Sequence, residues 1–448
     1  MATYLTRTTG NPTLGTKCTV SAWVKFNELP GGSGTDRWLF GEYGNGSNHS
    51  YLYQRNSSQI GWYEADGSGT VASIITNRLC RDVNAWYHFM IVYDTTDSTQ
   101  ADRFKMYING ERQTSFATNE NNISQNYLPR INKTGRTYHI GGVSGVQTMF
   151  TGLMSHYHHC DGSALAPTVF GSTDSTTGEW QINTSPSFTL GSNGFTILKD
   201  GNTITDQSTN SNDFALGAGT LNKTEDCPSN IFSIMNPMVT NNANGNFTHA
   251  NLGTNTGAAS WRSMFSSMGD NQGKYYCEMK YISGTNQMFG VYSLDQKNRI
   301  KNVGYVGDGN LGTQAVGIAK PGNYYINGAA ADYTGGSNTS WTTGDIIMIA
   351  LDRDNNKVYF GKNGTWMGSG DPTSGSTGTG AISFSPIANS HWGFATSCYG
   401  STSAANFGNG YFQTTAVSSA GTNASGNGIF EYNVPAGYTA LSTKGLNS

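Results

Sequence analysis

The chain has 448 residues, of which only 12% are charged, and its net charge is −3, so it lacks the basic footprint of a nucleic-acid-binding protein. Its 24 Tyr, 20 Phe and 9 Trp exclude a disordered chain in spite of 58 glycines. The composition therefore predicts a folded, turn-rich β protein of two or three domains.

No uninterrupted apolar run is long enough to cross a bilayer, so we expect no membrane insertion. The opening stretch, MATYLTRTTGNPTLGT, has no apolar segment of the kind found in secretory signals. Together with the polar, Asn/Thr/Gly-rich composition, this favours a protein that is made in a host cytoplasm and works outside it, as on a virus particle released by lysis.

The six cysteines are spread along the chain without a C-x-x-C pair: Cys18, Cys80, Cys160, Cys227, Cys277 and Cys398. This spacing is typical neither of a zinc site nor of a small disulfide framework. We expect free, mostly buried thiols.

Short β-prone runs separated by turn residues fill the first part of the chain, without an amphipathic helix, as in a sandwich. In Cys18–Phe26 the alternation places Trp23 on the polar face, which predicts a strand covered on both faces. The remaining expected strands of this part are Arg37–Tyr43, Ser50–Tyr53, Gln59–Tyr63, Val71–Ile75, Trp86–Tyr93, Phe104–Ile108, Tyr138–Ile140 and Gly152–His159.

A series of motifs follows along about Thr3–Phe170: W-V-K-F, W-Y-H-F-M-I-V-Y-D, M-Y-I-N-G-E, H-I-G-G and F-T-G-L-M-S-H-Y. Their order resembles that of the laminin-G/concanavalin A-like lectin family. The resemblance implies a jelly-roll sandwich of two antiparallel sheets. Its landmarks, mostly structural, are Trp23, Trp86, His88, Asn109, Gly110, Gly141 and Gly152.

The next stretch, Ala166–Met238, resembles the segment that follows lectin-like domains in virion proteins of tailed phages, especially marine phages. The phrase Asp161–Leu165 opens the matching pattern, and a further strand is expected around Phe195, Ile197 and Leu198. The other matching positions are Asp206, Ser208, Asn212, Phe214, Asp226, Pro228 and Asn230.

The second half contains the clearest local signal, Gly344–Met367, which predicts a hairpin that turns on Asp352 and Asp354 and then on Asn363-Gly364. With GKYYCEMK before it, this motif resembles the SPRY family, a β-sandwich of binding modules, over about Asn246–Phe412. The resemblance implies no catalytic activity. Near the end, the alternation of Phe430, Tyr432 and Val434 predicts a short docked strand.

Metal chemistry has weak support in the sequence. His156, His158 and Cys160 would share one face of a strand and His159 the other, but positions on a sandwich strand explain them better than a tetrahedral zinc set. Calcium is the usual ion of concanavalin A-like folds, yet no complete oxygen site is recognisable in Asp94, Asp97, Asp102 or Asp161, which suit turns. We therefore expect no metal and no cofactor.

Catalytic chemistry has still less support. A glucanase of this fold needs paired carboxylates on one strand, and Glu42, Glu64 and Glu111 stand alone in the sequence. We expect no enzyme activity and no catalytic residue. A glycan depolymerase is the alternative.

Aromatic side chains near loops are the remaining candidates for ligand contact, because sugar rings stack on aromatic faces beside neutral polar groups. The candidate binding residues are Trp38, Trp62, Tyr63, Trp341 and Trp366.

The sequence thus predicts an all-β protein with two antiparallel sandwich domains: residues 1–170, a β-rich connecting segment 171–243 that packs on the first domain, and residues 244–448 with a C-terminal strand. We expect a phage virion surface protein, a tail-fibre, head-fibre or decoration component, that binds a host-surface glycan or protein and other virion proteins, and that could form a homo-oligomer. A decoration protein without a ligand is a further alternative.

Overall fold

The structure, a computed structural model, describes residues 3–27, 36–145, 148–199, 203–240, 246–248, 253–255, 261–296, 304–320, 322–333 and 340–447. It is built almost wholly from antiparallel strands, which confirms the predicted all-β class. The chain divides into two compact units, Met1–Lys223 and Thr224–Ser448, called here the first and the second unit. Among the described residues, no helix has the length and apolar character that a bilayer crossing requires.

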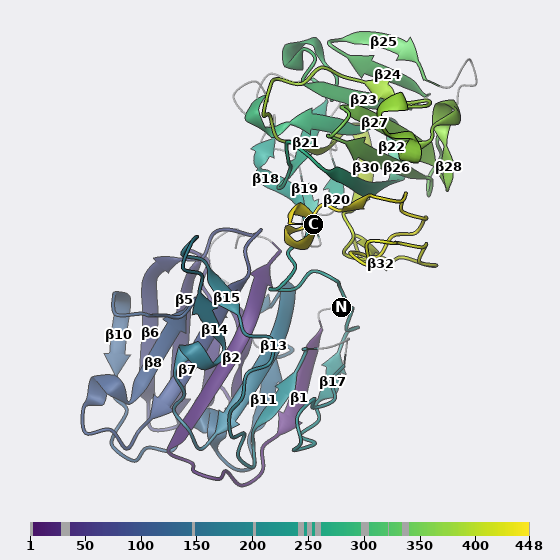
Figure 1. Cartoon of the computed structure of the whole chain (residues 1–448). Coiled ribbons are helices and arrows are strands. Elements are labelled where there is room, and N and C mark those ends of the chain that lie inside the picture. The colour runs from purple at the N-terminus through teal and green to yellow at the C-terminus, as the bar shows by residue number, and fades with distance from the viewer. Residues whose placement is uncertain are drawn as a thin grey trace. The chain divides into compact units, whose positions relative to one another are not determined.

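The first unit consists of two facing sheets (Figure 1). The larger sheet has the order β10-β6-β5-β4-β3-β11-β1-β17, with β12 paired to β3. Its strands are β1 (Tyr4–Thr8), β3 (Arg37–Asn45), β4 (Asn48–Gln54), β5 (Gln59–Asp66), β6 (Thr70–Leu79), β10 (Phe116–Asn121), β11 (Thr137–Ile140), β12 (Thr148–Met149) and β17 (Ala215–Ala218).

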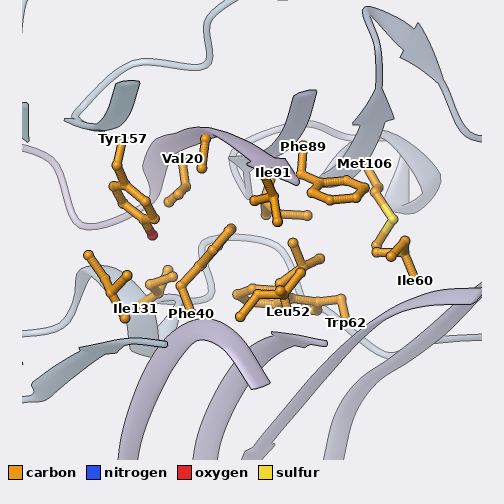
Figure 2. Packing of buried hydrophobic residues seen from close by; sticks show 14 of the residues in the cluster. Val20, Phe40, Leu52, Ile60, Trp62, Phe89, Ile91, Met106, Ile131 and Tyr157 are labelled. Atoms are coloured by element: carbon orange, nitrogen blue, oxygen red, sulfur yellow. The ribbon is translucent and has the colours of Figure 1, made fainter. Parts of the chain in front are cut away.

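The smaller sheet of the first unit has the order β16-β13-β2-β7-β8-β9. Its strands are β2 (Lys17–Phe26), β7 (Tyr87–Asp94), β8 (Phe104–Ile108), β9 (Glu111–Arg112), β13 (Gly152–Asp161) and β16 (Phe195–Ile197). Figure 2 shows the side chains of the two sheets meeting in one core, with Val20, Phe89 and Ile91 on one side and Phe40 and Leu52 on the other. All nine strands expected up to His159 are present, eight of them within three residues of the predicted bounds and β6 ending four residues later than expected, since their apolar alternation matches the pleat.

The outer face of the smaller sheet is covered by the segment that follows it, which includes the hairpin of β14 (Gly171–Thr173) and β15 (Trp180–Ile182). Trp23 stacks on His88 at 5.1 Å between ring centroids, and His88 stacks on Trp180 at 5.9 Å. Trp23 is consequently buried, which confirms the expectation that its strand is covered on both faces.

The connecting segment contributes to both units. Residues 171–223 belong to the first unit, and residues 224–240 belong to the second. The predicted border at residues 243 and 244 lies outside the described residues.

Two long strands organise the second unit, β22 (Lys274–Ser293) and β30 (Trp392–Asn406), which pair with each other along most of their length. One half of β22 also pairs with β26 (Ile346–Asp352), and the other half pairs with β23 (Ala315–Ala319). A register shift between Tyr281 and Ser283 separates the halves. The strands therefore pass from one layer into the other, and one buried cluster joins both layers.

The other strands of the second unit extend these layers, except β31 and β32, which form a small sheet of their own (Figure 1). They are β18 (Met235–Thr240), β19 (Asn246–Thr248), β20 (Gly253–Asn255), β21 (Arg262–Ser266), β24 (Asn323–Ile326), β25 (Ala329–Asp332), β27 (Lys357–Lys362), β28 (Thr365–Trp366), β29 (Ile382–Ser383), β31 (Tyr411–Phe412), β32 (Thr415–Ala416) and β33 (Thr439–Ala440), followed by helix α1 (Thr443–Leu446).

The predicted hairpin is confirmed as β26 and β27 with the turn between them. The Asp352 carboxylate accepts the Asn355 backbone N–H at 2.9 Å, and that of Asp354 accepts the Gly273 N–H at 2.7 Å. Asp352 is thus a turn-maker, as predicted, whereas Asp354 lies in the turn but its carboxylate holds the backbone just before β22.

The C-terminal strand lies at Thr439–Ala440, where it pairs with β22, and not at Phe430–Val434 as the alternation predicted. Phe430 and Val434 are nevertheless buried, so this stretch is docked. Its Glu431 and Tyr432 backbone N–H groups each donate at 2.8 Å to the buried carboxylate of Glu278. The Glu278 side chain therefore accepts backbone N–H groups that a neighbouring strand would accept if this stretch were the predicted strand.

Candidate functional site

An aromatic surface covers the outer face of the larger sheet in the first unit. The alternation of β4 turns Leu52 into the core and sends its neighbours outward, and β3 and β5 add further rings. We call this set the aromatic face: Trp38, Tyr43, His49, Tyr51, Tyr53 and Tyr63.

Strand register brings these rings together. Tyr51 lies opposite Tyr63, and Tyr43 lies opposite His49. Tyr53 lies opposite Gly61, where an added Cβ would come 2.3 Å from the Tyr53 ring. Glycine at this position therefore lets the tyrosine ring lie flat against the sheet.

The face has a buried part and a half-exposed margin. Trp38 stacks on Tyr51 at 4.3 Å with 14° between the ring planes, and both are largely buried. Tyr43, His49 and Tyr63 are half-buried and form a run of stacked rings, 6.0 Å and 5.3 Å apart. Because neighbouring strands lie about 4.8 Å apart, this margin extends over about 10 Å.

Hydrogen-bonding groups border the margin. The Tyr63 hydroxyl lies 3.2 Å from the Thr70 Oγ1. The Nδ1 of His49 lies 3.1 Å from the Asn45 carbonyl oxygen, so this nitrogen carries the proton and Nε2 is the acceptor. Burial lowers the pKa of His49, which favours this neutral form near pH 7. The margin thus offers flat rings beside neutral donors and acceptors.

A buried ion pair stands behind the margin. Arg130 donates to both carboxylate oxygens of Glu42, at 2.7 Å and 3.0 Å, and its Nη1 donates to the Asn48 side chain at 3.0 Å. The Arg130 backbone N–H donates to Glu64 at 2.8 Å, and Tyr127 donates to the same carboxylate at 2.9 Å. Glu42 and Glu64, which stand apart in the sequence, therefore meet at one arginine.

Donors of the protein supply the hydrogen bonds of the Glu42 and Glu64 carboxylates. Glu42 and Glu64 are 1% and 0% exposed, and Tyr93 also donates to Glu64. Burial raises the pKa of Glu64, although its hydrogen bonds oppose the shift. Their arrangement supports the turn that carries Asn48.

The predicted binding residues fall in different surroundings. Trp38 and Tyr63 come together on the aromatic face. Trp62 points to the opposite side of the sheet, into the core, where its Nε1 donates to the Tyr93 hydroxyl at 2.8 Å (Figure 2). Trp341 is fully buried beside Phe289. Trp62 and Trp341 are thus core residues: Trp62 points inward from β5, and Trp341, which lies outside any strand, packs into the core of the second unit.

Trp366 is half-buried and meets Tyr276 edge-on at 6.4 Å. It belongs to a small cluster in the second unit that includes Phe430 and Tyr432. The other predicted binding residues are not part of this cluster.

Four residues of the aromatic face were not predicted. Three of them, His49, Tyr51 and Tyr53, recur at every second position of NHSYLYQ. That period was the signal that could have found them.

The histidine cluster is part of the fold. His158 stacks on Phe170 at 5.5 Å, on the covered side of the smaller sheet, and its Nδ1 lies 2.9 Å from Thr196 Oγ1. His159 faces the other way and stacks on Phe195. Within the described residues, no group of three or more His, Cys, Asp or Glu side chains could hold a metal ion. None of the described cysteines forms a disulfide, and all except the half-exposed Cys227 are buried.

Comparison with known proteins bears on the first unit. The sequence model of the Concanavalin A-like lectin/glucanases superfamily matches residues 2–169, close to the expected bounds, and confirms that resemblance. A comparison with curated protein sequences gave no match.

Two solved structures show likeness to the chain. The SPRY domain of human HERC1 is 15% identical with a TM-score of 0.29, and the match covers 38% of this chain and 96% of that domain. The heptameric SAP-like pentraxin of Limulus polyphemus is 16% identical with a TM-score of 0.27, and the match covers 37% of this chain and 72% of the pentraxin.

Proposed function

We propose that the chain is a glycan-binding protein of a virion surface, and that the half-exposed margin of the aromatic face is where the glycan binds. The main observation in support is the run of stacked rings formed by Tyr43, His49 and Tyr63 beside neutral hydrogen-bonding groups. Sugar rings present C–H groups that pack on aromatic faces and hydroxyls that need such partners. The match of residues 2–169 to a lectin and glucanase superfamily supports the same choice.

The virion part of the proposal rests on the sequence. The resemblance of Ala166–Met238 to virion proteins of tailed phages supports it, and the host-surface glycan, or a host protein, would be the partner together with other virion proteins. Labelling purified particles with an antibody against the chain should mark a tail fibre, a head fibre or the capsid lattice. Absence of the chain from purified particles would refute this part alone.

The glycan part predicts a specific loss in two variants. Titrating a host-surface polysaccharide into the full chain should give binding that Tyr63→Ala and His49→Ala each weaken about tenfold or more, because each removes a ring from the margin. Tyr107→Ala is the matched control, since Tyr107 is a half-buried tyrosine on the other sheet of the same unit. It should bind as the wild type does.

Equal binding by the two margin variants and the wild type would contradict the proposal. Release of new reducing ends from the polysaccharide would instead identify a depolymerase. No binding to any host glycan, with particles unaffected by loss of the chain, would identify a decoration protein without a ligand.

A further inference from the structure

The second unit contains an aromatic-walled pocket of about 210 Å³ on the outer face of one layer. It is separate from the aromatic face, which belongs to the first unit. Its lining residues are Trp261, Asn286, Gln287, Met288, Tyr305, Ala319, Lys320 and Tyr325.

Three neighbouring elements supply the walls. Trp261 directly precedes β21, Tyr325 lies on β24, and Tyr305 lies in a turn that crosses the sheet. The centroid of the Tyr305 ring is 5.5 Å from that of Trp261 and 5.6 Å from that of Tyr325. Tyr399 of β30 extends the wall, at 5.7 Å from Trp261.

The turn that carries Tyr305 is held firmly on the sheet. The Val306 backbone N–H donates to Ser397 Oγ at 2.9 Å. The Val306 carbonyl lies so close to β23 that a Cβ added at Gly317 would meet its oxygen at 2.1 Å. Asp308 closes the turn by accepting the Gly304 and Asn310 backbone N–H groups, at 3.1 Å and 2.7 Å. The pocket is therefore formed in advance of any ligand, which lowers the entropic cost of binding.

Lys320 is the charged residue of the lining. Its Nζ lies 4.7 Å from the centroid of the Tyr281 ring and 3.2 Å from the Tyr281 hydroxyl. That hydroxyl donates in turn to the Gly284 carbonyl oxygen, so it accepts from Lys320. The ammonium group is thus fixed at the edge of the aromatic walls with donors left over, since it carries three.

We propose that this pocket binds an acidic sugar, a uronic acid unit of a polysaccharide. The aromatic walls would contact the ring, the exposed Asn286 amide would meet hydroxyls, and Lys320 would pair with the carboxylate. The volume limits the occupant to one ring-sized group. A neutral sugar offers the fixed ammonium no negative charge to pair with, which is why the charge of the ligand follows from Lys320.

The test is a calorimetric titration of the intact chain with a tetrasaccharide of glucuronic acid. A second titration uses the same tetrasaccharide after reduction of its carboxyl groups. We expect the acidic form to bind at least tenfold tighter. Lys320→Met should remove that preference, and Trp261→Ala should weaken both forms. Lys444→Met is the matched control, because Lys444 is an exposed lysine of the same unit outside the pocket lining.

Equal binding of both forms by the wild type, or an unchanged preference in Lys320→Met, would refute the proposal. So would tighter binding of a Glu-rich peptide in competition with the tetrasaccharide, which would identify a protein ligand. The inference stands apart from the function proposed for the first unit. Tyr63→Ala should leave this preference intact, and loss of the preference in that variant would also count against a separate site.

Discussion

Glu278 shows how a single side chain determines local structure in the second unit. Its carboxylate is fully buried and accepts the backbone N–H groups of Glu431 and Tyr432 and the hydroxyl of Tyr276. Burial raises the pKa of Glu278 to about 7, because desolvation outweighs these hydrogen bonds. The docked C-terminal stretch thus depends on one carboxylate.

Replacing this carboxylate should release the stretch. Glu278→Ala leaves buried N–H groups without acceptors, at about 1 to 3 kcal/mol each, so we expect a lower melting temperature of the second unit and faster amide exchange at Glu431 and Tyr432. Hydrogen exchange measured by mass spectrometry checks this. Glu431→Gln is the control, since it keeps the backbone N–H and an oxygen that can accept from Ser418, and unchanged exchange in Glu278→Ala would show that the stretch is held by its apolar contacts instead.

At the scale of elements, both units use the same turn. Asn109-Gly110 follows β8 and Asn363-Gly364 follows β27, and all four residues have positive φ, between 48° and 85°. Each asparagine side chain accepts a strand backbone N–H, from His88 at 2.8 Å and from Ile346 at 2.9 Å. Asparagine and glycine tolerate this backbone, so the turn follows from local sequence.

Their surroundings differ, and a mutation should show it. An alanine Cβ at Gly110 would lie 2.4 Å from the Trp180 ring, in addition to the strain of a φ of 75°. Gly135 has a φ of 69° and open space around it. Gly135→Ala should therefore cost about 1 kcal/mol of unfolding free energy, and Gly110→Ala clearly more. Urea denaturation of both variants measures this, and equal costs would mean that the tryptophan moves aside freely.

The sequence predicted those parts of the fold that depend on local chemistry, such as the hairpins and the apolar strands. It missed β1, β10 and β17, because their strand character comes from the neighbours they pair with; β17 is the mostly exposed run ALGA. It also misplaced the C-terminal strand, because no pattern shows that Glu278 takes the place of a strand. For the candidate site, proximity to loops selected Trp62 and Trp341, although Trp62 points inward from its sheet and the Trp341 loop packs its side chain into the core.

At the scale of the whole molecule, ionisable groups are divided unevenly. The first unit buries three neutral histidines, His88, His158 and His159, whose pKa values fall to about 3, 3 and 4 because of desolvation. The second unit buries Glu278, whose pKa is raised to about 7. The two units should therefore respond to pH in opposite directions.

Between pH 4.5 and 6.5 the unfolded first unit binds protons on its histidines that the folded unit does not, so its stability rises with pH, by about 1.4 kcal/mol per pH unit for each fully linked histidine. Glu64, with its raised pKa, opposes this in part. In the second unit folded Glu278 keeps a proton that the unfolded chain loses, so stability falls as pH rises. Calorimetry of the full chain at several pH values should show two unfolding transitions whose melting temperatures shift in opposite directions as pH rises. Shifts in the same direction would contradict this assignment.

Each unit also has its own two ends tied together. In the first unit β1 pairs with β17, and Thr3 Oγ1 donates to the Thr220 carbonyl oxygen at 2.8 Å. In the second, the Ser233 N–H donates to the Leu441 carbonyl and the Thr443 N–H to the Ile231 carbonyl, both at 2.9 Å. Because the two ends of each unit lie close together, each unit can be inserted into a surface loop of another protein without distortion of its fold. Either unit could therefore be transferred between genes as an intact domain.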